Sequence, residues 1–206
     1  MRLSVSRINE FYMDPVYYYI KRYGGWKDRA AYAAWRGIAV EECVVPLLRQ
    51  RKAIDWSKAA KKVDKAYQKL CEEGNPEPTE EEREDKAKEE ARLPGYLKEA
   101  YSALAPFGRP SQVQRKLEFQ WLGHEWLGYI DFWYQGKRII VDLKTRGSDT
   151  KHLSQSWVRQ GALYQSWVRT TFPEARTVFA VATPKKHRHI ELDQEQTEDG
   201  LEQIVR

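Results

Sequence analysis

The chain has few of the residues and patterns that mark membrane, secreted or metal-cluster proteins. Only two cysteines, Cys43 and Cys71, occur in its 206 residues, too few for a four-cysteine zinc site or an iron–sulfur cluster. No apolar run approaches the roughly 20 residues of a membrane span, and the N-terminus lacks the apolar core of a signal peptide. We therefore expect a cytoplasmic protein without membrane contact, in which both cysteines are reduced.

The composition is that of a folded globular protein. Hydrophobic residues make up 41% and aromatic residues 13% of the sequence, which excludes a disordered chain. A length of 206 residues suits one domain with a sizeable core and an insertion. The net charge of +5 and the pI near 9.1 mildly favour a polyanionic partner.

The N-terminal part of the chain has helical spacing of its apolar residues. Residues 4–23 predict a helix with Ser4 or Ser6 as the N-cap. Pro15 should end this helix and open the next one. Residues 29–49 predict a further helix.

Residues 51–105 carry no strand signal, and we interpret them as a charged helical insertion. Thr79, with Glu82 three residues later, predicts a helix N-terminus within it. Residues 49–69 hold eight Lys or Arg against two acidic residues. This basic stretch is either a contact for a phosphate backbone or a solvated helix face.

The pattern changes to strands after residue 110. Three apolar segments separated by turn signals predict an antiparallel meander. They cover residues 113–122, 125–134 and 137–145. A helix, one or two further strands and a final helix follow at 151–169, 175–183, 187–192 and 194–206. This order predicts an α/β fold, in which a central mixed sheet is flanked by helices.

Charged residues follow directly on the buried strand of "RIIVDLKTRG". Because side chains alternate along a strand, Asp142 and Lys144 should share one face while Val141 and Leu143 point to the other. Burying such charges is expensive. An exposed ion pair at a sheet edge is the simplest explanation, since a lone D-x-K tripeptide is common by chance.

The preceding hairpin brings a second carboxylate near this strand. A two-residue turn at 135–136 would make Asp131 and Asp142 diagonal neighbours, and one at 136–137 would place them directly opposite each other. Two such carboxylates repel unless a cation lies between them. Oxygen ligands of this kind suit Mg²⁺ or Mn²⁺.

The arrangement of "GYID" and "DLK" resembles the PD-(D/E)XK nuclease superfamily, in its RecB-like and phage lambda exonuclease-like branch. Asp131 matches the first aspartate of the motif, while Asp142 and Lys144 match the D/E-x-K. Upstream, "SVSRINEFYMDPVYYY" is similar to the N-terminal helix signature of the RecB-like group.

Two further stretches match in the expected order. In "RGIAVEE", Gly37 is followed four residues later by Glu41, which the resemblance makes a metal ligand, although adjacent Glu42 leaves the assignment open by one residue. In "RQGALYQ", Gln160 and Tyr164 lie one helical turn apart and match a downstream pair that steadies the lysine or contacts the scissile strand.

The resemblance implies a restriction-endonuclease-like core in a single domain over 1–206, with the insertion at about 51–105. It implies one or two Mg²⁺ (or Mn²⁺) ions, with Lys144 orienting water or stabilising charge in the transition state. The implied metal ligands are Glu41, Asp131, Asp142 and the carbonyl of Leu143. Some relatives hold an iron–sulfur cluster with one early and three late cysteines, but Asp14 stands at the early position and no cysteine follows residue 71. We expect no cluster.

The function implied is that of an Mg²⁺-dependent deoxyribonuclease, an exonuclease in recombination or repair that acts on single- or double-stranded DNA. A small stand-alone form suggests a phage-encoded protein in the host cytoplasm. Alternatives are a structure-specific or single-strand endonuclease of the same fold and a non-catalytic nucleic-acid-binding module. A homo-oligomer and a recombination partner protein both remain open.

Overall fold

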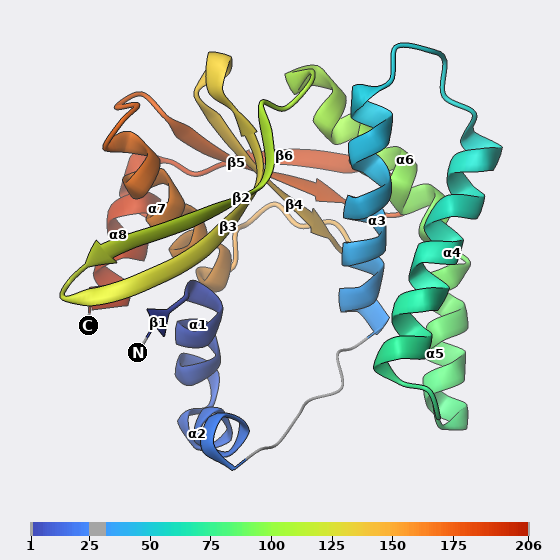
Figure 1. Cartoon of the computed structure of the whole chain (residues 1–206), viewed down its shortest axis with the longest axis horizontal. Helices are drawn as coiled ribbons and strands as arrows, with labels where there is room; N and C mark the ends of the chain where they lie inside the picture. The colour runs from blue at the N-terminus through green and yellow to red at the C-terminus, as the bar shows by residue number, and fades with distance from the viewer. Residues whose placement is uncertain (1, 25–31, 206) are drawn as a thin grey trace.

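The computed structural model describes residues 2–24 and 32–205, which form a mixed sheet with helices on both sides (Figure 1). The strands are β1 (Arg2–Leu3), β2 (Gln112–Trp121), β3 (His124–Tyr134), β4 (Ile139–Thr145), β5 (Arg176–Ala182) and β6 (His187–Glu191). The α-helices are α1 (Val5–Met13), α2 (Pro15–Tyr23), α3 (Tyr32–Arg49), α4 (Trp56–Gly74), α5 (Glu80–Glu90), α6 (Leu93–Leu104), α7 (Gln155–Arg169) and α8 (Gln194–Val205). This architecture confirms the α/β, restriction-endonuclease-like fold predicted from the sequence.

The sheet has the strand order β1-β3-β4-β5-β6, and β2 pairs with β3. The predicted meander is confirmed, because β2, β3 and β4 pair antiparallel in sequence order. β4 and β5 are parallel and are connected through α7, while β6 pairs antiparallel with β5. Our prediction missed β1, whose two residues pair parallel with β3 and are too few for a periodic signal.

The N-terminal helices begin and end where their capping residues dictate. Ser4, one of the two predicted caps, accepts a hydrogen bond from the Arg7 N–H at the start of α1. Asp14 caps α2 in the same way, with Pro15 in its first turn. The third helix was predicted over 29–49 and is described as α3, while 29–31 lie outside the described residues.

The insertion is helical as predicted, since α4, α5 and α6 fill it. Thr79 and Glu82 form the predicted capping box at the start of α5. On α4, the side chains of Ala59, Val63 and two further residues at the same spacing are buried. The helix therefore packs into the molecule, and its lysines lie on the opposite, exposed face.

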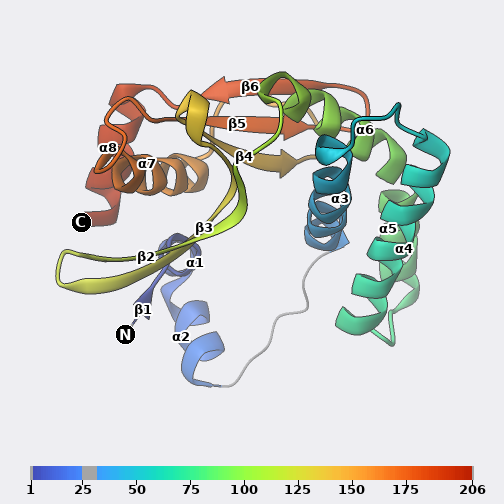
Figure 2. The same ribbon diagram turned by 45° about the horizontal axis from the view of Figure 1, so that its top comes forward.

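Helices lie on both sides of the sheet (Figure 2), and each face of β4 packs in a separate apolar cluster. Val141 and Leu143 pack in a cluster with α3, α4 and α6. Ile140, from the other face of β4, packs in a cluster with α1 and α7. Asp142 therefore lies on the α7 side of β4, and its position on the face opposite Val141 and Leu143 agrees with the predicted alternation. The α7 helix begins at Gln155, four residues later than predicted, after Ser154 caps it.

Candidate active site

The strands β3 and β4 separate at the two aspartates of the motif. Their last paired residues at this end are Phe132 and Val141, and Asp131 and Asp142 occupy the next opposed position. Asp131 replaces the missing ladder contact, because its Oδ2 accepts a hydrogen bond of 3.0 Å from the Leu143 N–H. The register that places the two aspartates opposite each other is therefore present. The predicted two-residue turn is wrong, since four residues connect Tyr134 to Ile139.

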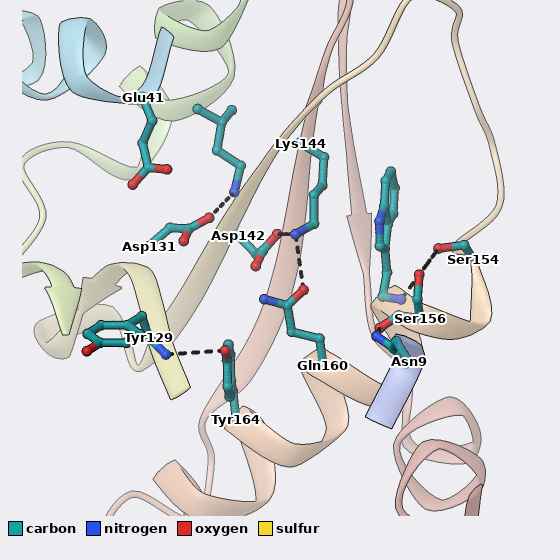
Figure 3. Close-up of polar contacts among 12 residues, drawn as sticks. Asn9, Glu41, Tyr129, Asp131, Asp142, Lys144, Ser154, Ser156, Gln160 and Tyr164 are labelled. Carbon is teal, nitrogen blue, oxygen red and sulfur yellow. Dashed lines mark hydrogen bonds and ion pairs between the residues drawn. The ribbon is translucent and has the colours of Figure 1, made fainter. Parts of the chain in front are cut away.

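Lys144 is held from two sides next to the sheet (Figure 3). Its Nζ lies 2.6 Å from Asp142 Oδ2 and donates a hydrogen bond of 3.1 Å to Gln160 Oε1 on α7. Asp142 is only 2% exposed. Among the described residues, neither carboxylate oxygen of Asp142 receives a geometrically good hydrogen bond, so the lysine charge is its principal compensation. A buried carboxylate in this position favours a cation.

Glu41 approaches the same place from α3. The Nε2 of Gln114 on β2 donates hydrogen bonds to Glu41 Oε1 and, at 3.2 Å, to Asp131 Oδ1. Glu41 is partly buried, whereas Glu42 is exposed. The structure thus brings Glu41, and not its neighbour, to the aspartates, as the four-residue spacing predicted.

Tyr164 contacts β3 from α7, near the residues where β3 and β4 stop pairing. Its hydroxyl accepts a hydrogen bond of 3.3 Å from the Tyr129 N–H on β3. Gly128 is required beside it, because a Cβ at this residue would lie 2.6 Å from the Tyr164 ring. Tyr164 therefore fixes β3 against α7, while Gln160 is the member of the predicted pair that contacts the lysine.

Burial and the neighbouring charges together raise the pKa values of Asp131, Glu41 and Lys144. Burial raises the pKa of Asp131 well above its usual range, and Asp142 and Glu41 raise it further. Burial also raises the pKa of Glu41, against the hydrogen bond from Gln114. Burial alone would lower the pKa of Lys144, but Asp142 and Asp131 outweigh this effect and leave it raised. Lys144 therefore stays cationic, while the carboxyls favour additional positive charge.

The donor set fits a hard divalent cation in its chemistry. Glu41, Asp131 and Asp142 offer only oxygen, and among the described residues the buried Asp142 carboxylate has the Lys144 ammonium beside Oδ2 but no hydrogen bond of good geometry. In their present positions, no three His, Cys, Asp or Glu side chains of the described residues stand close enough together to hold a metal. Gln114 lies between two of the carboxylates, so binding would require a small rearrangement.

The Trp157 ring lies beside Lys144 and Arg146 at the edge of the site. The Lys144 Nζ lies 5.9 Å and the Arg146 guanidinium carbon 5.5 Å from the centre of the Trp157 ring. Trp157 in turn stacks on Phe179, with ring centres 5.8 Å apart. Arg146 is exposed, so its charge faces solvent at the edge of the site with its side chain held against the indole.

Sequence reasoning missed Gln114 and Arg36. Arg36 is buried, precedes Glu41 on α3, and donates hydrogen bonds to the Thr145 carbonyl, at 2.9 Å, and to Glu89, at 2.5 Å. It thereby ties α3 to the end of β4 and to α5 of the insertion. Its position next to Gly37 was the only available signal. Gln114 gave none, because its role depends on strand register.

Comparison with known protein families gives a match, which covers almost the whole chain. The family model described as the PD-(D/E)XK nuclease superfamily matches residues 2–206. A search of curated proteins finds no match. In the part of the chain that the structure describes, no helix is both long and apolar enough to cross a membrane.

Proposed function

The chain belongs to the PD-(D/E)XK nuclease superfamily, and we propose that it is a metal-dependent nuclease that hydrolyses DNA phosphodiester bonds at the strand separation of β3 and β4. Members of such a superfamily are hydrolases of nucleic acid. The observation that carries the proposal is the position of Lys144, which lies between Asp142 and Gln160. This constellation is more than an exposed edge pair, because Asp142 is buried.

Glu41, Asp131, Asp142 and the carbonyl of Leu143 would hold one or two Mg²⁺ or Mn²⁺ ions. When bound, such an ion polarises the phosphodiester and lowers the pKa of water. The oxygen ligands and the raised pKa of Asp131 support this assignment. Gln160 and Tyr164 would keep α7 and its contacts in place.

Lys144 acts as a cation in this proposal and not as a base. Its ammonium group is held by Asp142 and Gln160, and its pKa is raised. A fixed positive charge beside the reacting phosphate stabilises the charge that develops there. Arg146, held against Trp157, would contact an adjacent phosphate of the same strand.

Within the superfamily, we assign the chain to the RecB-like and lambda exonuclease-like branch and to exonucleolytic cleavage in recombination or repair. The Ser4-capped α1, the Asp14–Pro15 junction and the Gln160–Tyr164 pair support the branch. The positive net charge supports DNA as the substrate.

The test is incubation with end-labelled linear DNA and with covalently closed circular DNA, in Mg²⁺, in Mn²⁺ and in chelator. Wild-type protein should shorten the linear DNA only when metal is present. Asp142→Asn and Lys144→Ala should each lower the rate at least about a hundredfold, while Lys185→Ala, an exposed lysine elsewhere on the surface, should retain it.

The other outcomes separate the alternatives. Cleavage of the circle would identify an endonuclease of the same fold. DNA binding without cleavage in any metal would identify a non-catalytic module and refute the proposed chemistry. Full activity of Asp142→Asn with an unchanged circular dichroism spectrum would refute the assigned site.

A further inference from the structure

Gln114 has a backbone conformation that side chains rarely adopt. Its φ is +50°, in the left-handed region, yet it lies inside β2. The other described non-glycine residues with positive φ, Leu122 and Arg138, lie in the turns that end β2 and precede β4. A residue held there costs on the order of 1 kcal/mol or more. Its surroundings must supply compensating contacts.

Those contacts are made by the side-chain amide. Gln114 faces Asp131 across the β2–β3 ladder, between the pairs Val113–Phe132 and Arg115–Ile130. One amide nitrogen carries two N–H donors, and here the nitrogen serves two carboxylates, Glu41 and Asp131. The neutral amide reduces the repulsion between the carboxylates without contributing a charge.

The acceptors of these hydrogen bonds are the atoms that a metal would need. Asp131 Oδ2 accepts the hydrogen bond from the Leu143 N–H, while Oδ1, which accepts from Gln114, is the oxygen that lies towards Glu41. Glu41 Oε1 is engaged by the same amide. Nε2 of Gln114 therefore lies between the two oxygens, and a cation that bridged Glu41 and Asp131 would need the place that this amide occupies.

We propose that Gln114 is a positioning residue that sets the metal affinity of the site: its amide holds Glu41 and Asp131 together and must release at least one of them when a divalent ion binds. The role rests on the proposed metal-dependent function. Gln114 is exposed, so its released side chain can turn towards solvent. Metal affinity is thus lower than the three carboxylates alone would give.

The direction of the mutational effect distinguishes this role from a simple structural one. A residue that only supports the site would weaken metal binding when removed. Loss of a competing donor should instead tighten binding by about tenfold, because hydrogen bonds to charged groups are among the stronger ones. The same change should lower the melting temperature in chelator, since the two carboxylates then face each other without a donor.

Isothermal titration with Mn²⁺ and melting curves in chelator test this on the full chain. Gln114→Gly removes the amide and adopts the positive φ without strain. Gln114→Glu keeps the size but adds a fourth carboxylate. Both should bind Mn²⁺ about tenfold or more tightly than wild type. Gln112→Ala, two residues earlier in β2 and also exposed, should bind as wild type does.

The outcomes separate this role from the proposed function. If wild type binds Mn²⁺ and both Gln114 variants bind it equally or more weakly, the competing role is refuted while the metal site stands. If wild type and all variants take up no Mn²⁺, the metal site itself is refuted, and this role with it.

Discussion

The two oxygens of Asp131 have different surroundings. Oδ2 replaces a ladder hydrogen bond at the Leu143 N–H, while Oδ1 lies beside Gln114 and Glu41. The first contact is structural and needs only an acceptor. The negative charge itself is unfavourable, because the carboxylate is desolvated and close to Asp142 and Glu41. Stability and metal binding therefore place opposite demands on this residue.

Asp131→Asn should raise the free energy of unfolding in chelator by on the order of 1 kcal/mol, since it removes the charge and keeps an acceptor for the Leu143 N–H. The same variant should lose the rise in melting temperature that Mn²⁺ produces in wild type. Urea unfolding with and without Mn²⁺ measures both effects. Asp131→Ala is the matched control, because it also loses the acceptor and should be less stable than Asp131→Asn by about 1–3 kcal/mol. An Asp131→Asn variant less stable than wild type would contradict this balance.

The residues of the D/E-x-K motif could be predicted because strand alternation is a local property. Asp142 and Lys144 had to share a face wherever the strand lay. The sequence left two registers for Asp131, either diagonal to Asp142 or directly opposite it. The turn signal "QG" did not reveal that four residues connect the two strands. Gln114 could not be found, since its partner Glu41 is 73 residues away in the sequence and only the folded sheet brings the two together.

At the scale of elements, α3 is positioned by a buried arginine. Arg36 is 4% exposed, lies over the Tyr96 ring at 4.4 Å, and bonds both Thr145 on β4 and Glu89 on α5. It fixes the turn of α3 that precedes Glu41 relative to the end of the strand that carries Lys144. The insertion thus contributes a carboxylate that supports the site without entering it.

Glu89→Ala should lower the free energy of unfolding by about 3 kcal/mol, because it leaves the buried Arg36 charge without its ion-pair partner. Glu84→Ala, on the same helix, removes an exposed pair with Lys88 and should change stability by no more than about 0.5 kcal/mol. Urea denaturation of the two variants provides the comparison. Equal stabilities would show that the Arg36–Glu89 pair does not anchor the insertion.

At the scale of the whole molecule, one core joins the insertion to the sheet. Val63 and Tyr67 of α4 and Leu97 of α6 pack in the same cluster as Val141 and Leu143 of β4. We therefore propose one domain over 1–206, in which the helices at 51–105 form part of the nuclease core. The apolar faces of these helices follow from periodicity, but their docking on α3 and β5 depends on contacts that no local pattern encodes.

Several whole-molecule predictions stay as they were made from the sequence. They are the absence of an iron–sulfur cluster, a cytoplasmic location, a phage origin, and a homo-oligomer or recombination partner protein. The exposed lysines of α4 fit either a contact for a phosphate backbone or a solvated helix face. The salt dependence of DNA binding by variants with these lysines replaced would distinguish a backbone contact from a solvated face.

The central claim is that Glu41, Asp131 and Asp142 bind divalent metal, one or two ions, beside the Lys144 ammonium. A crystal structure of the wild-type protein grown with Mn²⁺, with anomalous data collected at the manganese edge, locates the ion directly. We predict an anomalous peak about 2.0–2.4 Å from oxygens of Asp131 and Asp142, with the Gln114 amide turned away from at least one carboxylate. A peak elsewhere on the chain, or these carboxylates without one at saturating Mn²⁺, would contradict the account.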